Sequence, residues 1–229
     1  GYSNIPDKTM GKLIPESPCI WKIDLISGNT TPLLSYNDFY KFETRKEMSS
    51  AENKVNHIMI SPSGSRFMVL HRWMHGQRKY SRLVTCNTDG TGMYNLLDDD
   101  MVSHCNWKND DEIIAFANKK NSGVGYYLLR DKTNDFKHLW PGLDRDGHPS
   151  YSPDLSLVLT DTYPDRARMS SVYCMGENED PHVVAKVFMP FKYDNDTRCD
   201  LHPRWRRDGN GLCIDSVKFG KRSLFIGRV

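Results

Sequence analysis

Histidine recurs at one place in a pattern that repeats along this chain. Three positions after each of these histidines comes a large apolar residue, and a polar turn and a second apolar run follow. Imidazole is the commonest side-chain ligand of transition metals, and its near-neutral pKa also lets it move protons. The recurrence predicts a shared metal or acid–base site at His57, His104, His148 and His202. The alternative is that each histidine only hydrogen-bonds a neighbouring repeat and holds the structure together.

Carboxylates occupy fixed positions in the same repeat. Asp146 and Asp200 each stand two residues before a histidine, and Asp161 and Asp215 follow the same two histidines by thirteen residues. Carboxylates complete metal sites with imidazole or orient the rings from behind. We expect the orienting role for Asp146 and Asp200, whereas Asp161 and Asp215 either contact a ligand or cap turns between strands. The metal would be Mn, Zn, Fe or Ni rather than an ion that prefers thiolate.

Basic residues form a third set, at the expected start of the third strand in three of the repeats. Arginine binds carboxylates and sulfates through two parallel hydrogen bonds. A metal together with several arginines suits an acidic ligand, such as a sugar that contains uronate, although single charges before a strand are usually solvated. The residues are Arg78, Lys79, Arg166, Arg168, Lys221 and Arg222.

The elements that must position these residues are short strands. A repeat of roughly 40–50 residues built only of short strands is typical of a β-propeller blade. We therefore expect an all-β propeller of four-stranded blades, with four to five blades present in one domain over residues 1–229. Because the ends supply incomplete blades, we interpret the chain as part of a larger, seven-bladed ring; the alternative is a four-bladed ring closed by both termini. The expected blades are 55–101, 102–145 and 146–199, with partial blades at 19–54 and 200–229.

The bulk composition excludes several classes of protein. The net charge is +2, which gives no case for nucleic-acid binding. The mean hydropathy is −0.63 and no run of about 18 apolar residues occurs, so we expect a soluble protein without a membrane span, the cytoplasm being favoured. The six cysteines form no CxxC pair, which argues against a zinc ribbon and leaves buried thiols or disulfides open. A first residue other than Met suggests a processed or truncated piece.

Two segments resemble the repeat of TolB-like propellers, namely His148-Pro-Ser-Tyr-Ser-Pro-Asp and His202-Pro-Arg-Trp-Arg-Arg-Asp. Over roughly residues 55–229 the chain looks more specifically like the oligogalacturonate-lyase-like branch. The segments that carry this resemblance are Leu70-His71-Arg72-Trp73, Asn87-Thr88-Asp89-Gly90-Thr91-Gly92, Ser103-His104-Cys105-Asn106-Trp107, Asp146-Gly147-His148-Pro149 and Asp200-Leu201-His202-Pro203.

The resemblance implies a seven-bladed propeller that cleaves short pectic oligomers by β-elimination with a divalent metal, typically manganese. Carried over, it makes His104, His148 and His202 the candidate metal ligands. It makes His57 or His71 the base that removes a proton, and it makes Arg72, Arg168 or Arg222 a partner of substrate carboxylates. Because many TolB-like propellers are binding modules, the second hypothesis is a non-catalytic propeller that binds a glycan or a protein partner through the same rim.

Overall fold

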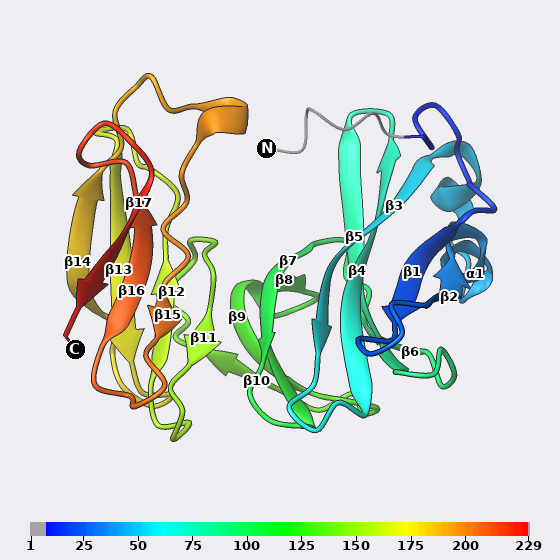
Figure 1. Ribbon diagram of the computed structural model, residues 1–229, viewed down its shortest axis with the longest axis horizontal. Coiled ribbons are helices and arrows are strands. Elements are labelled where there is room, and N and C mark those ends of the chain that lie inside the picture. The colour runs from blue at the N-terminus through cyan, green and yellow to red at the C-terminus, as the bar shows by residue number, and fades with distance from the viewer. Residues whose placement is uncertain (1–7, 229) are drawn as a thin grey trace. The chain divides into compact units, whose positions relative to one another are not determined.

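The computed structural model describes residues 8–228, and within them the chain forms two compact units. The first unit comprises residues 103–130 and 135–228, and the second comprises residues 8–102 and 131–134. Each unit is built of antiparallel sheets in which strands adjacent in the sequence are also neighbours in the sheet (Figure 1). The prediction of a single domain stays a prediction.

The second unit contains a two-stranded and a four-stranded sheet. A short helix, α1 (Tyr36–Lys41), and a 3₁₀ turn, η1 (Lys46–Ser50), connect the two sheets. Helix α1 starts where the sequence supplies a capping box, because Ser35 and Asp38 each accept a hydrogen bond from the other's backbone N–H. The strands are β1 (Pro18–Ile23) and β2 (Thr30–Ser35) in the smaller sheet, and β3 (Glu52–Ile60), β4 (Arg66–His75), β5 (Arg78–Asn87) and β6 (Tyr94–Leu97) in the larger.

The first unit contains two four-stranded sheets and a three-stranded sheet. A 3₁₀ turn, η2 (Asn195–Thr197), precedes the last sheet. The strands are β7 (Val102–Trp107), β8 (Glu112–Lys119), β9 (Gly123–Arg130) and β10 (Phe136–Leu139), then β11 (Ser150–Tyr151), β12 (Val158–Asp161), β13 (Met169–Met175) and β14 (His182–Phe188), and finally β15 (Arg204–Trp205), β16 (Leu212–Ser216) and β17 (Ser223–Gly227).

These meanders confirm the prediction of an all-β propeller fold built of four-stranded blades. The expected blade 55–101 corresponds to β3–β6, and the blades 102–145 and 146–199 correspond to β7–β10 and β11–β14. The central strands are almost continuous apolar runs, as in β8 and β9, whose side chains are largely buried. Strands that are buried on both faces carry such runs instead of a strict alternation of apolar and polar residues.

Apolar packing and polar contacts join the last two sheets of the first unit. Leu159 of β12 and Val172 of β13 pack with Ile214 of β16 in one buried cluster. The indole of Trp205 donates a hydrogen bond to the Ser150 carbonyl, and the Ser150 hydroxyl donates one to the Pro203 carbonyl. These contacts fix the start of β15 beside the start of β11, where two of the recurring histidines lie.

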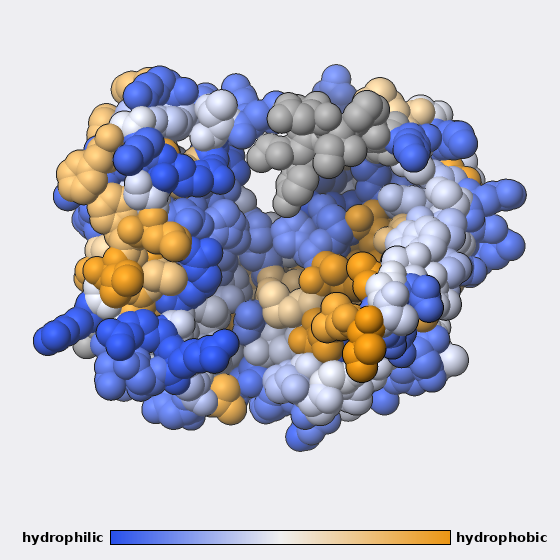
Figure 2. All heavy atoms as spheres, viewed as in Figure 1, coloured by the Kyte–Doolittle hydropathy of each residue, from blue (hydrophilic) through white to orange (hydrophobic). Residues whose placement is uncertain are grey.

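The two-stranded sheet leaves apolar side chains uncovered. Trp21 and Ile23 of β1 and Ile58 and Ile60 of β3 are each at least half exposed and line a cavity of about 390 Å³. Figure 2 shows this apolar surface as an orange area over β1 and the end of β3.

All six cysteines lie in the part of the chain that the structure describes, and all are free thiols. Burial is the main reason that the pKa of Cys19 is raised to about 12 and that of Cys86 to about 11. Within residues 8–228, no helix has the length and apolar character needed to cross a membrane.

Candidate functional site

Three of the recurring histidines lie in a row in the first unit. His104 belongs to β7, and His148 and His202 stand just before β11 and β15. The ring centres of His104 and His148 are 4.0 Å apart, and those of His148 and His202 are 4.1 Å apart. The repeated position in the sequence thus becomes one continuous cluster of imidazoles.

Each of the three rings has its Nδ1 atom next to an oxygen. Nδ1 lies 3.0 Å from Asp146 Oδ1 in His104, 2.8 Å from Asp161 Oδ1 in His148, and 3.0 Å from the Asp200 carbonyl in His202. An Nδ1–H that donates to oxygen leaves the Nε2 lone pair for a metal or a proton. The oxygens therefore set the tautomer in which Nε2 can act.

Asp161 accepts hydrogen bonds from two of these histidines. Its side chain is 1 % exposed. One of its oxygens accepts hydrogen bonds from the backbone N–H and Nδ1 of His148, and the other accepts one from the backbone N–H of His202 at 3.0 Å. Gly147 permits this approach, because a Cβ at that position would stand 1.8 Å from the Asp161 carbonyl oxygen. Asp161 thus fixes both the rings and the backbone that carries them.

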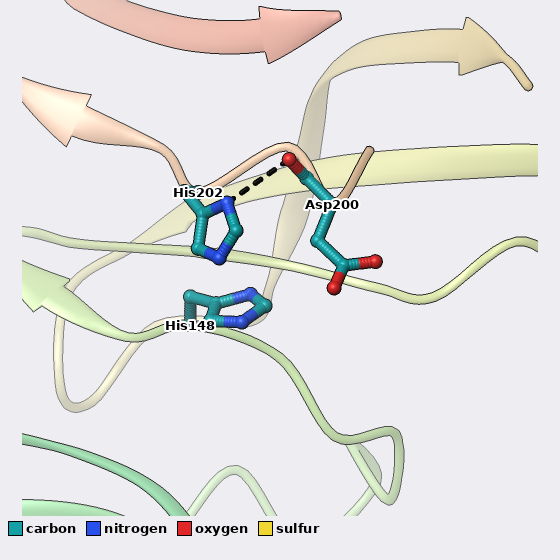
Figure 3. Close-up of side chains that lie close together, drawn as sticks. All are labelled: His148, Asp200 and His202. Carbon is teal, nitrogen blue, oxygen red and sulfur yellow. Dashed lines mark hydrogen bonds between the residues drawn. The ribbon is translucent and has the colours of Figure 1, made fainter. Parts of the chain in front are cut away.

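Two of these histidines and one carboxylate can converge on a metal ion. His148, Asp200 and His202 each offer a ligand atom, and these atoms all lie within 4.8 Å of one another. Figure 3 shows the rings of His148 and His202 facing each other, with the Asp200 carboxylate beside them. Two neutral imidazoles and a carboxylate suit Mn, Fe or Zn, and the Asp161–His148 hydrogen bond is the support that such ligands usually have. The residues present therefore fit a divalent metal.

Asp200 is held in place by Arg198, a residue outside the recurring positions. The Nε and Nη2 atoms of Arg198 donate to the two Asp200 oxygens at 2.6 and 3.1 Å. The Arg198 guanidinium also lies 4.4 Å from the centre of the Tyr163 ring. Tyr163 in turn faces His104, with its hydroxyl 3.5 Å from His104 Nε2.

The charges around the cluster push its pKa values in different directions. Burial lowers the pKa of His148, but the hydrogen bond with Asp161 and the charges of Asp161, Asp200 and Asp146 outweigh it, so the pKa is raised. Burial and the charge of His148 lower the pKa of His202. Burial would raise the pKa of Asp161, but its hydrogen bond and charge interaction with His148 hold it below the ordinary value. His148 is therefore the more basic of the two rings.

A cavity of about 640 Å³ opens beside this cluster. It is lined by Arg145, Asp146, Thr162, Tyr163, Asp165 and Arg166 among others. Asp146 and Tyr163 both contact His104, so the cavity adjoins the row of histidines. Burial, then the charges of Asp146 and Asp200, raise the pKa of Tyr163 to about 12, which keeps its hydroxyl protonated at neutral pH.

The two candidate bases, His57 and His71, and the candidate carboxylate partner Arg72 lie in the second unit. His57 is exposed at an irregularity of β3, where its φ is 55°. His71 is fully buried, and its ring nitrogens lie 3.0 Å from Asn53 Oδ1 and 3.2 Å from Arg82 Nε. Burial and the charge of Arg82 lower the pKa of His71 to about 3. Arg72 borders a cavity of about 210 Å³. A buried, neutral His71 is better suited to packing in the core beside β4 than to acting as a catalytic base.

The remaining predicted residues hold loops around the cluster. The Arg168 guanidinium donates to the carbonyls of Met189 and Tyr193, and Arg222 donates to the carbonyl of Arg198. Asp215 lies 3.6 Å from His202 Nδ1 and also pairs with Arg204 at 3.3 Å. The structure therefore places Asp215 at the edge of the cluster and uses Arg168 and Arg222 in backbone contacts.

The positions that sequence reasoning missed are Arg198, Tyr163 and Gly147. Arg198 stands two residues before Asp200, and Tyr163 stands two residues after Asp161. In extended chain, a spacing of two places side chains on the same side. That rule, applied around each predicted aspartate, was the available signal for Arg198 and Tyr163.

No family model matches this sequence, and no curated protein matches it. Solved structures do match. A structure described as oligogalacturonate lyase in complex with manganese is similar over 90 % of this chain and 53 % of its own, with a TM-score of 0.68 and 21 % identity. TolB from Acinetobacter baumannii matches over 91 % of this chain and 46 % of its own (TM-score 0.56, 12 % identity). A putative TolB from Agrobacterium tumefaciens matches over 90 % of this chain and 64 % of its own (TM-score 0.54, 12 % identity).

At these identities the similarity establishes the fold. The chain spans about half the length of the lyase and of the Acinetobacter TolB, and about two thirds of the Agrobacterium protein. The resemblance seen in the histidine repeats is thus matched in three dimensions: this chain has the β-propeller fold of TolB-like proteins and is similar in structure to oligogalacturonate lyase.

Proposed function

We propose that the first unit binds a divalent metal and, with it, catalyses a β-elimination next to a uronate carboxylate. The carbon that bears the carboxylate loses its proton, a C=C bond forms to the next carbon, and the glycosidic C–O bond at that carbon breaks, its oxygen taking up a proton. The observation that carries this proposal is the convergence of ligand atoms from His148, Asp200 and His202, with Asp161 buried behind two of these residues. The manganese in the lyase structure, which has the same fold, is consistent with it.

The protein groups divide into ligands and supports. His148 and His202 would hold the metal through Nε2, and Asp200 would hold it through a carboxylate oxygen. A bound divalent metal would polarise the substrate carboxylate and make the neighbouring C–H more acidic. Asp161 keeps His148 in the required tautomer, and Arg198 keeps the Asp200 carboxylate in place.

His104 is the proposed base, in place of His57 and His71. Its Nε2 faces Tyr163 beside the cavity, while its Nδ1 lies 3.0 Å from Asp146. A proton taken up at Nε2 makes the ring cationic, and the Asp146 carboxylate stabilises that charge. The protonated hydroxyl of Tyr163 can donate a hydrogen bond to a ligand oxygen in the same cavity.

The test is elimination itself. The protein is incubated with trigalacturonate, with Mn²⁺ and after treatment with a chelator, and the new C=C bond is followed by its ultraviolet absorbance. We expect product only with metal. His104→Gln should retain Mn²⁺ binding and reduce the rate at least about 100-fold, in line with loss of a general base. Equal rates for the wild type and His104→Gln would refute the role of His104.

A second candidate function is binding of an acidic glycan or a protein partner without turnover. The observation that favours it is the match to two TolB structures over about nine tenths of this chain. Under this proposal the protein binds trigalacturonate with Mn²⁺ present, yet no absorbance develops during prolonged incubation. The same experiment therefore separates the two candidates.

A further inference from the structure

Arg198 has an unusual position between the candidate metal ligands and the cavity. It follows η2, and the guanidinium of Arg222 fixes its backbone by donating to the Arg198 carbonyl at 2.9 Å. One edge of its own guanidinium, Nε with Nη2, grips both oxygens of Asp200. Its face lies against the ring of Tyr163, which lines the cavity of about 640 Å³. Three contacts thus hold one arginine in a defined orientation.

A second edge of the same guanidinium stays available. A guanidinium has five N–H donors, enough for two bidentate contacts along different edges. Among residues 8–228, the hydrogen bonds of the Arg198 side chain use Nε and Nη2 only, and the side chain is 37 % exposed. A salt bridge to Asp200 alone would require neither the contact with Tyr163 nor this exposure.

The adjoining cavity is lined by two guanidinium groups and two carboxylates. Its two carboxylates are already engaged, since Asp146 contacts Ser103 and His104, and Asp165 accepts backbone hydrogen bonds from its own loop. Within the described part of the chain, the exposed guanidinium groups of Arg145 and Arg166 form no ion pair with these carboxylates. These two guanidinium groups are therefore available to an anion that Arg198 binds.

We propose that Arg198 is the residue that selects acidic ligands, binding a ligand carboxylate through its Nη1–Nη2 edge while its Nε–Nη2 edge orients Asp200. This inference rests on the proposed function, because it assigns a ligand carboxylate to the same site. It adds a specificity determinant that couples the metal ligand Asp200 to the charge of the ligand. A ligand without that carboxylate leaves the second edge without its partner and gains less from binding.

The test compares a charged ligand with its uncharged counterpart. Digalacturonate and its dimethyl ester are titrated calorimetrically into the protein at saturating Mn²⁺, and the ratio of their affinities is the readout. Arg198→Lys keeps the positive charge and loses the planar fork. Arg206→Lys is the matched control, because Arg206 pairs with Asp208 on the surface of the same unit. Mn²⁺ affinity is measured separately for each variant.

The wild type should prefer the acid, and Arg198→Lys should reduce that preference on the order of tenfold, with the affinity for the ester unchanged. Arg206→Lys should match the wild type. The proposal is overturned if the wild type shows no preference for the acid, or if Arg198→Lys changes only Mn²⁺ affinity and leaves the preference intact. If the wild type binds no Mn²⁺, the proposed function fails, and the same ratio measured without metal still decides the role of Arg198.

Discussion

Asp161 and His71 occupy comparable positions in the two units and have very different surroundings. Each lies in the second strand of its sheet, thirteen or fourteen residues after a recurring histidine, and each is buried. Asp161 stays anionic by accepting hydrogen bonds from His148 and from the backbone of His202. His71 stays neutral between Asn53 and Arg82. The position in the second strand accounts for the burial of both side chains. The residue type decides whether the buried side chain is an anion that can accept hydrogen bonds from neighbouring histidines.

The difference extends to the neighbouring residues. Asp161 accepts its hydrogen bonds from the segments that lead into β11 and β15. Its buried negative charge therefore lies next to the histidine cluster. The guanidinium of Arg82, beside His71, donates hydrogen bonds to the carbonyls of Phe39, Phe42 and Glu43. The second unit therefore uses the corresponding position to fix α1 and the segment that follows it, and the first unit uses it to build a site.

The largest effect is expected from the glycine beside Asp161. Gly147→Ala would put a Cβ 1.8 Å from the Asp161 carbonyl oxygen, so the backbone must move. We expect the first unit to lose about 3 kcal/mol of stability, as for severe overpacking, measured by urea unfolding. Gly142→Ala is the control, because a Cβ there meets nothing within 4 Å. Similar losses in the two variants would mean that the close approach at Asp161 does not matter.

The next effect concerns acid stability through His71. Its folded pKa of about 3 lies below the ordinary value of 6.5, so the unfolded chain binds the proton first. The stabilisation is complete above about pH 6.5 and is lost as the pH falls toward 3, at about 1.4 kcal/mol per pH unit. Between pH 6.5 and 4.5 the wild type should thus lose roughly 2 kcal/mol from this group.

His71→Gln removes the titration and serves as the comparison for that measurement. Unfolding free energies of both proteins are determined from pH 7 to pH 4.5, and the difference between them should shrink as the pH falls. A difference that stays constant across this range would show that His71 is not held neutral by burial and by Arg82.

A smaller effect should follow from removing the charge of Asp161. Asp161→Asn keeps the size of the side chain but weakens the support of His148, and loss of such a support typically costs 10–100-fold in metal affinity, about 1.4–2.8 kcal/mol. Mn²⁺ titrations of Asp161→Asn and of Asp208→Asn, a surface control, give the comparison. Equal Mn²⁺ affinities in these two variants would remove Asp161 from the site.

The sequence predicted the propeller blades well because the signal was repetitive. In each repeat a large apolar residue stands three positions after the histidine, and a polar turn and a second apolar run follow, which is the pattern of consecutive short strands. Of the residues near His148, the sequence named His104, Asp161 and His202 and missed Arg198 and Tyr163. It did not predict the separate roles of Asp161 and Asp200. The spacing shows that both lie near the histidines, but it does not show which of the two is buried.

The burial of Asp161 depends on Gly147 and on the approach of the segment before β15, which are contacts between distant parts of the chain. The role of Arg198 depends on the aromatic face of Tyr163, 35 residues earlier in the sequence. Neither set of contacts produces a repeating pattern in the sequence. The arginines that did follow the repeat, Arg168 and Arg222, are used mainly to hold loops.

Direct titration with Mn²⁺, followed by the loss of the free-ion electron paramagnetic resonance signal, tests the metal site most directly. We predict one bound Mn²⁺ per chain in the wild type and an affinity at least about 100-fold lower in His148→Gln and in His202→Gln, since each removes a ligand. His182→Gln, a change on exposed β14, should bind like the wild type. Absence of Mn²⁺ binding, or equal binding by all four proteins, would contradict a metal site at His148, Asp200 and His202.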